Sequence, residues 1–348
     1  MDLNSLNKIA VAMVAPGKGI LAADESTGTI KKRFDSIGVT STEDNRRDYR
    51  EMLFRASEAM ENHISGVILY DETIRQKAAD GTPLVKVIEG AGSIPGIKVD
   101  MGAKDLHGFP GEKVTEGLDG LRERLAEYYK LGARFAKWRA VIDIGDQSGG
   151  CGSYSIPTRY CLKSNAEALA RYASLCQEAG IVPIVEPEVL MDGGHDIDRC
   201  DEVTRASLSA LFKALKDARV ALEGVILKPN MVISGKKSKK QASTEEIAEK
   251  TVACFRATVP AAVPGIVFLS GGQSEVQATE NLNTMNAAYQ DVMPWGLSFS
   301  YGRALQAGAL SAWSGKPANV QAGADAFAHR ARMNGLAQKG EWSKSLEG

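Results

Sequence analysis

The chain has few cysteines and histidines and no excess of either charge. Its 348 residues include five cysteines and four histidines, and the formal net charge is -1. Nucleic-acid and membrane-surface proteins need basic surfaces, so we expect neither partner. The cysteines are odd in number and lack metal-ligand spacing, which is typical of reduced thiols in a cytoplasmic protein.

Long apolar runs and linker-like segments are absent as well. No apolar stretch is long enough to span a bilayer, and the start, Met1-Asp2-Leu3-Asn4, lacks the basic and apolar regions of a secretory signal. We therefore expect one domain over residues 1–336, followed by a flexible polar tail at 337–348.

Short apolar runs recur along the whole chain. Eight of them have the composition of buried β-strands, at 19–23, 65–70, 96–100, 134–142, 181–187, 224–229, 265–270 and 296–300. Amphipathic stretches such as Leu118–Leu131 separate most of these runs. Buried strands that alternate with helices predict a parallel sheet. Eight such units predict an α/β fold, a single (β/α)₈ TIM barrel, with an additional N-terminal helix near residues 5–14.

Lys228 stands at the end of one apolar run, Gly224-Val-Ile-Leu-Lys-Pro-Asn230. A buried ammonium is costly unless it is paired or discharged. A lysine held where its neutral amine is favoured can attack a carbonyl carbon and form a Schiff base. The position of Lys228 therefore indicates a nucleophile.

Polar residues close the other runs too. They are Asp24; Lys98 and Asp100; Lys137 and Arg139; Glu186 and Glu188; Ser270-Gly271-Gly272; and Ser300-Tyr301-Gly302-Arg303. Active sites of such barrels lie at the carboxyl ends of the strands, so we expect these side chains to meet at one mouth. The alternative, a structural ion pair for each, explains single residues but not so many charges together.

These residue types suit chemistry on a carbonyl carbon. A positive charge from Lys137 near Lys228 would favour the neutral, nucleophilic amine. Glu186 and Glu188 can move protons while a carbinolamine forms and loses water. Asp24 can hold or deprotonate a substrate hydroxyl. The set fits carbon–carbon bond chemistry in which an iminium accepts the electrons.

Two groups of residues are candidate phosphate sites. Small residues and a guanidinium follow the last two strands, where these barrels usually bind phosphate: Ser270, Gly271, Gly272, Ser300, Gly302 and Arg303. An ordinary tight turn is the alternative there. A second group consists of Ser26, Thr29, Arg33 and Lys98, for which a capped helix start is the alternative.

At these residues the chain resembles class I fructose-bisphosphate aldolase over about residues 17–310. The matching strings are Gly19-Ile-Leu-Ala-Ala-Asp-Glu-Ser-Thr-Gly28, Gly66-Val-Ile-Leu69, Gly96-Ile-Lys-Val-Asp100, Phe135-Ala-Lys-Trp-Arg139, Ile181-Val-Pro-Ile-Val-Glu-Pro-Glu188, Leu227-Lys-Pro-Asn-Met-Val232, Phe268-Leu-Ser-Gly-Gly-Gln-Ser274 and Phe299-Ser-Tyr-Gly-Arg-Ala-Leu-Gln306.

The resemblance implies a carbon–carbon lyase that needs no metal or cofactor, acts on a sugar bisphosphate in cytoplasmic glycolysis and gluconeogenesis, and forms a homotetramer. Its implied roles are Schiff-base formation by Lys228, acid/base catalysis by Glu186 with help from Glu188, Lys137 and Arg139, and C–C cleavage at the C4 hydroxyl by Asp24. The two phosphate groups would bind at the two sites named above. Fructose 1,6-bisphosphate, fructose 1-phosphate and sedoheptulose bisphosphate remain alternative substrates.

The sequence departs from the family pattern in two places. Many members end in a tyrosine that aids proton transfer on the enamine, whereas no tyrosine follows Tyr301 here. We expect a mobile tail without a phenol to offer no positioned acid at the site. The segment 146–164 also looks longer than in familiar members and is expected at the mouth of the barrel.

Two other functions are alternatives to this one. A zinc-dependent aldolase needs clustered histidines, but His63, His107, His195 and His329 are scattered along the sequence. A binding protein that keeps the fold would rely on the basic run Gly235-Lys-Lys-Ser-Lys-Lys240, for which a solvated loop is the simpler interpretation.

Overall fold

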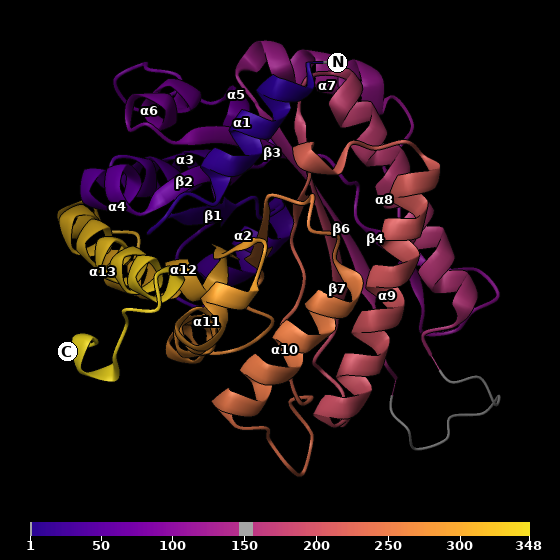
Figure 1. The fold of residues 1–348 in the computed structure, drawn as a ribbon. Coiled ribbons are helices and arrows are strands. Elements are labelled where there is room, and N and C mark those ends of the chain that lie inside the picture. The colour runs from indigo at the N-terminus through magenta and orange to yellow at the C-terminus, as the bar shows by residue number, and fades with distance from the viewer. Residues whose placement is uncertain (1, 146–155) are drawn as a thin grey trace.

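Eight parallel strands close into a barrel, and helices surround it (Figure 1). This computed structural model describes residues 2–145 and 156–348. Neighbouring strands in the barrel follow the order β1-β10-β9-β8-β7-β6-β3-β2. Their bounds are β1 Gly19–Ala23, β2 Ile64–Leu69, β3 Ile94–Lys98, β6 Phe135–Ile142, β7 Val182–Val189, β8 Ile226–Leu227, β9 Gly265–Phe268 and β10 Gly296–Tyr301. The predicted (β/α)₈ barrel is confirmed.

The helices form the outer layer. They are α1 Leu3–Met13, α2 Thr27–Asp35, α3 Glu43–Phe54, α4 Ser57–Asn62, α5 Asp71–Arg75, α6 Leu84–Gly90, α7 Leu121–Leu131, α8 Arg159–Glu178, α9 Ile197–Asp217, α10 Thr244–Thr258, α11 Glu275–Tyr289, α12 Arg303–Trp313 and α13 Val320–Gln338. Short 3₁₀ turns occur at Leu222–Gly224, Gln290–Val292, Pro317–Asn319 and Lys344–Leu346.

The barrel interior is apolar at its amino-terminal end. Alternate residues of the strands point inward, and Phe135 fills the centre. A methyl group at Gly96 would lie 2.3 Å from the Phe135 ring, and one at Gly66 would lie 2.9 Å away. Both positions therefore require glycine. The predicted N-terminal helix is α1, and it covers this end of the barrel because Leu6, Ala10, Met13 and Val14 pack with the interior residues.

A two-stranded hairpin was missed by the sequence analysis. Strands β4 (Ala103–Asp105) and β5 (Lys113–Thr115) pair antiparallel outside the barrel. The intervening segment Gly108-Phe-Pro-Gly111 is a turn signal, but both strands are short and mostly polar. Glu112 next to β5 accepts hydrogen bonds from the N–H and hydroxyl of Thr158, both at 2.6 Å, and so ties the hairpin to the start of α8.

The end of the chain differs from the expected loose tail. Helix α13 runs through 337–338, and the remaining residues fold back onto it. The Trp342 side chain is only 7 % exposed, and its indole N–H donates to Glu347 at 2.9 Å. Glu347 also accepts two hydrogen bonds from Arg330, at 3.0 and 2.6 Å. Buried aromatic surface and a bidentate ion pair hold this segment, although its composition is polar.

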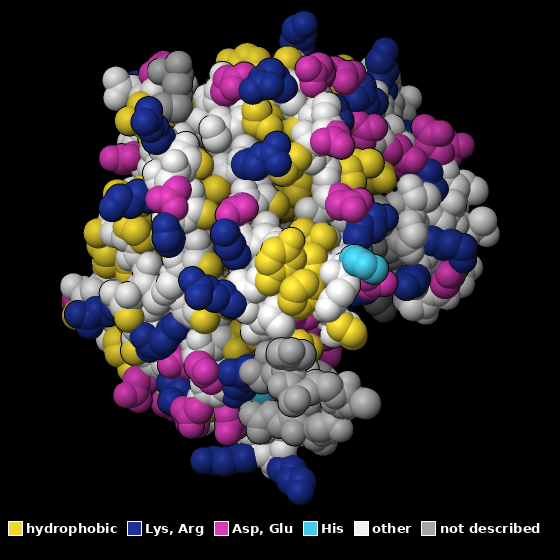
Figure 2. Space-filling model, turned by 90° about the vertical axis from the view of Figure 1, so that its right-hand side faces the viewer, with side chains coloured by type: hydrophobic (Ala, Val, Ile, Leu, Met, Phe, Trp, Pro, Cys, Tyr) yellow, Lys and Arg dark blue, Asp and Glu magenta, His cyan; other side chains and the backbone are white. Residues whose placement is uncertain are grey.

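The surface carries both signs of charge. On the face shown in Figure 2, Lys and Arg side chains are interspersed with Asp and Glu. Within residues 2–145 and 156–348, no helix is both long and apolar enough to cross a membrane.

Candidate active site

Strand alternation carries polar side chains to the carboxyl end of the barrel. In β6 the inward residues are Phe135, then Lys137, then Arg139; in β7 they are Ile184 and then Glu186. Arg139 and Glu186 are register partners. Each strand thus contributes an apolar residue to the barrel core and a charged residue one step higher. The predicted convergence at one mouth is found.

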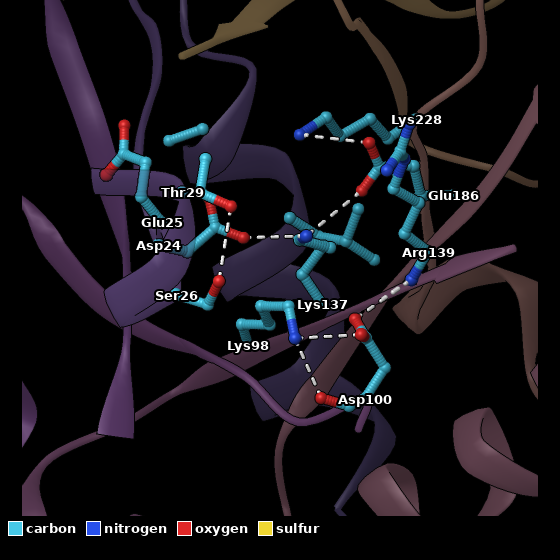
Figure 3. Close-up of polar contacts among 12 residues, drawn as sticks. Asp24, Glu25, Ser26, Thr29, Lys98, Asp100, Lys137, Arg139, Glu186 and Lys228 are labelled. Carbon is cyan, nitrogen blue, oxygen red and sulfur yellow. Dashed lines mark hydrogen bonds and ion pairs between the residues drawn. The ribbon is translucent and has the colours of Figure 1, made fainter. Parts of the chain in front are cut away.

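Lys228 directly follows β8, which is shorter than the predicted 224–229. Its N–H still donates to the carbonyl of Val185 at 2.9 Å, so the backbone stays fixed to β7. The side chain is 4 % exposed, and Nζ lies 3.4 Å from Oε1 of Glu186 (Figure 3). A buried amine beside a carboxylate is a suitable nucleophile with a proton-transfer group at hand.

Glu186 lies between two lysines. Its Oε2 is 3.4 Å from Nζ of Lys137, on the opposite side from Lys228. Apart from this ion pair, Oε2 accepts no hydrogen bond among the described residues. A buried carboxylate oxygen without a hydrogen bond is available to a substrate hydroxyl or to water.

Lys137 links Glu186 to Asp24. Its Nζ lies 2.6 Å from Oδ2 of Asp24, which follows β1, and the two strands are not neighbours in the barrel. Burial favours a raised pKa for Asp24, but the ammonium groups of Lys137 and Lys228 outweigh burial and lower that pKa to about 2. Burial would lower the pKa of Lys137, whereas Asp24 and Glu186 raise it above its ordinary value. Lys137 is therefore a fixed cation and Asp24 a fixed anion.

Arg139 and Lys98 are held by carboxylates. Arg139 pairs with Glu188 through Nε, and its N–H donates to Asp100 at 3.3 Å. Burial would lower the Arg139 pKa, but Glu188 outweighs it and raises the pKa. Nζ of Lys98 lies 2.8 Å from both the carbonyl and Oδ1 of Asp100 (Figure 3).

Two loops bring together the residues of the first predicted phosphate site. Gly271 and Gly272 follow β9 with φ of 52° and 75°, values that glycine adopts without strain. Arg303 begins α12 after β10, and its Nη2 donates to the carbonyl of Gln273 at 3.0 Å. That bond places the guanidinium against the turn that starts at Ser270. The buried hydroxyl of Ser300, in β10, has no partner among the described residues.

The residues of the second predicted phosphate site are only partly brought together. Ser26 precedes α2, and its hydroxyl is 3.2 Å from that of Thr29 (Figure 3). Arg33 instead pairs with Glu25, and a methyl group at Gly302 would lie 3.6 Å from its Nη2. Arg33 therefore lies beside the first predicted phosphate site, since β1 and β10 are neighbours in the barrel.

Glu25 is a site residue that the sequence analysis missed. Besides Arg33, it accepts a hydrogen bond from the Gln306 amide at 3.0 Å, and its carbonyl accepts one from buried Arg50 at 2.9 Å. Its place directly after Asp24 was the available signal. The pairing with Arg33 depends on the fold of α2.

Among residues 2–145 and 156–348, no three His, Cys, Asp or Glu side chains are grouped so that they could hold a metal ion. In the segment 146–164, residues 146–155 lie outside the described residues, and α8 begins at Arg159.

Comparisons with known proteins agree with one another. The family model "Glycolytic: Fructose-bisphosphate aldolase class-I" matches residues 5–348. The "probable fructose-bisphosphate aldolase class 1" of Xanthomonas campestris pv. campestris is 57% identical over 98% of this chain and 99% of its own. Fructose-bisphosphate aldolase C of Carassius auratus is 54% identical over 98% of this chain and 91% of its own. The structure of fructose-bisphosphate aldolase from Plasmodium falciparum, in complex with TRAP and an inhibitor, superposes with a TM-score of 0.93 at 48% identity, covering 98% of this chain and 96% of that one.

Proposed function

Because the chain belongs to the class I fructose-bisphosphate aldolase family, we propose that Lys228 is the lysine that forms this family's Schiff base. The family's reaction is the reversible cleavage of fructose 1,6-bisphosphate to dihydroxyacetone phosphate and glyceraldehyde 3-phosphate, in glycolysis and gluconeogenesis and without a metal. The chain is accordingly a carbon–carbon lyase.

One observation carries the assignment of residues. Lys228, Glu186, Lys137 and Asp24 form a continuous line of alternating charge, with contacts of 3.4, 3.4 and 2.6 Å between successive groups. Structural ion pairs seldom bury four charges in a row, since each burial costs free energy. A site that moves protons along a substrate needs such a line.

The first half of the reaction uses Lys228 and Glu186. Lys228 first passes its ammonium proton to Glu186, and the resulting neutral amine attacks the C2 carbonyl carbon. A proton then moves from the nitrogen to the carbonyl oxygen, which becomes the carbinolamine hydroxyl. Glu186 in its acid form then protonates that hydroxyl, and water leaves as the nitrogen lone pair forms the iminium. The 3.4 Å contact between Lys228 and Glu186 supports this role, because the departing oxygen is bonded to the carbon that the Lys228 nitrogen attacks.

Bond cleavage uses Asp24 and Lys137. The proton of the C4 hydroxyl passes to Glu186, which the dehydration step leaves as a carboxylate. The C3–C4 bond then breaks, and its electron pair passes into the iminium to give an enamine and an aldehyde. A carboxylate with a pKa of about 2 is a weak base, so Asp24 mainly orients the hydroxyl. Lys137 stabilises the negative charge that develops on the C4 oxygen. Protonation of the enamine at C3 and addition of water then release dihydroxyacetone phosphate and free Lys228.

The order of the strands in the barrel suggests which site binds each phosphate of the substrate. The turn Ser270–Gly272 follows β9, the neighbour of β8 and Lys228, so it suits the phosphate on C1, next to the reacting carbonyl. Strand β3, with Lys98, lies opposite β9 in the eight-strand ring. Lys98, with Ser26 and Thr29, suits the phosphate at the far end of the sugar. Arg33, beside Gly302, suits the C1 phosphate as well.

Borohydride trapping tests the assignment. Dihydroxyacetone phosphate and borohydride should label the protein covalently, with the label on the peptide that contains Lys228. Lys228→Met should abolish both labelling and cleavage, whereas Lys8→Met on the surface should change neither. Labelling of Lys228→Met at the stoichiometry of the unaltered protein would assign the Schiff base to another lysine.

We propose further that the protein is a cytoplasmic homotetramer, as the family resemblance implies. The four cysteines among the described residues, Cys161, Cys176, Cys200 and Cys254, are free and buried, which suits a reducing compartment. Sedimentation velocity at micromolar concentration measures the assembly. A monomer at all concentrations would contradict the tetramer.

A further inference from the structure

The basic run Gly235–Lys240 has no role in the mechanism above, yet part of it is built into the mouth of the barrel. The N–H of Lys236 donates to the carbonyl of Met191 at 2.7 Å, and that of Lys237 to Gly193 at 3.1 Å. A methyl group at Gly235 would lie 2.2 Å from the carbonyl oxygen of Gly193, so the two loops touch. The loop after β8 is thereby fixed to the loop after β7.

The side chain of Lys236 lies on the phosphate turn. A methyl group at Gly272 would be 2.4 Å from Cε and 2.6 Å from Nζ of Lys236. Met191 packs under the same turn, because a methyl group at Gly271 would be 2.8 Å from its Cε. The ammonium of Lys236 is thus adjacent to the backbone that is proposed to receive the C1 phosphate.

Asp192, which pairs with Lys236 in this structure, can compete only weakly with a phosphate group for the ammonium. Nζ lies 2.8 Å from Oδ1 of Asp192, and the two side chains are 48% and 64% exposed. Exposed ion pairs contribute little because water screens them and both side chains lose freedom. A phosphate group carries more charge and three acceptor oxygens, so it can displace a single carboxylate.

We propose that Lys236 is a further phosphate-binding residue, whose ammonium exchanges Asp192 for the C1 phosphate when substrate binds. The inference rests on the function proposed for the Ser270–Gly272 turn. It gives one lysine of the basic run a role in substrate affinity. Lys239, in the same run, is exposed and serves as the matched control.

Three variants test the exchange in the condensation direction, where each phosphate can be titrated separately. Lys236→Gln should raise the KM for dihydroxyacetone phosphate about five- to twentyfold, while kcat and the KM for glyceraldehyde 3-phosphate stay within about twofold. Asp192→Asn frees the ammonium and should lower the KM for dihydroxyacetone phosphate about two- to threefold. Lys239→Gln should change no constant.

The two variants are expected to change the KM for dihydroxyacetone phosphate in opposite directions, which distinguishes phosphate binding by Lys236 from a purely structural ion pair. If Lys236→Gln and Asp192→Asn raise the KM by the same factor, the pair merely supports the loop and the inference is wrong. An effect on the KM for glyceraldehyde 3-phosphate alone, or no effect of Lys236→Gln, also overturns it. Arg303→Ala tests the phosphate site independently: a raised KM with Arg303→Ala but not with Lys236→Gln removes only Lys236, whereas no effect of either removes the site.

Discussion

Replacing Lys137 by Met should damage both stability and activity in a pH-dependent way. Lys137 is 4 % exposed and is the cation between the carboxylates of Asp24 and Glu186. Met has similar length without charge. The variant removes the closest cation from two buried carboxylates and leaves Asp24 with only the weaker influence of Lys228 and Lys98. The protein must then either keep poorly paired charge or bind a proton.

The magnitude at neutral pH follows from Asp24. Its pKa falls from an ordinary 3.8 to about 2 in the folded protein, a difference that corresponds to about 2 kcal/mol of stabilisation at pH 7. Without Lys137, burial raises the pKa instead, and the stabilisation becomes a penalty. We expect Lys137→Met to lower the free energy of unfolding by about 3 kcal/mol at pH 7.

The effect should shrink in acid. Since the folded pKa of Asp24 is below its unfolded value, its contribution is present above about pH 4 and is lost as pH falls toward 2. In Lys137→Met we expect the pKa of Asp24 to be higher in the folded than in the unfolded protein. Protonation of Asp24 therefore relieves the cost of its buried charge as pH falls through that pKa. The two proteins should therefore differ less at pH 4 than at pH 7.

Urea denaturation at fixed protein concentration, at pH 7 and pH 4, measures this difference. Lys137→Arg is the control, because it keeps the charge and should keep the pH dependence. Cleavage by Lys137→Met should fall by at least about a hundredfold, because the C4 oxygen loses its cation. An equal loss of stability at both pH values would refute the assigned pairing of Lys137 and Asp24.

Three further outcomes are expected. Glu186→Gln should lower kcat by about 10²–10⁴-fold by removing the proton donor for dehydration; rapid-quench borohydride trapping should show slower imine formation, and a kcat within fivefold of the unaltered protein would contradict the role. Gly96→Ala places a methyl group 2.3 Å from Phe135 and should destabilise the barrel by about 2 kcal/mol. Gly90→Ala, with no atom within 4 Å, is its control in thermal unfolding. Incubation with EDTA should leave cleavage unchanged, and activity that is lost to chelator and restored by zinc would contradict an imine mechanism.

The barrel and the candidate residues at its mouth could be predicted from the amino-acid sequence. Short apolar runs indicate the strands, and the alternation of side chains between the two faces of a strand is a local property of the backbone. Phe135 and Lys137, two residues apart, must therefore face the same interior at different heights. Their position at the ends of apolar runs selected Asp24, Lys98, Glu186 and Lys228 from four of the eight runs. The comparisons show the family that the sequence motifs indicated.

Tertiary structure alone decided which of these residues are partners. The contacts of Lys137 with Asp24 and Glu186 join strands that are far apart in the sequence, and they depend on how the barrel closes and on side-chain conformation. For the same reason the sequence grouped Arg33 with Lys98, whereas the fold of α2 places it beside Gly302. The docking of Trp342 and the position of Lys236 on Gly272 likewise arise from loops and termini, whose paths no periodic pattern encodes.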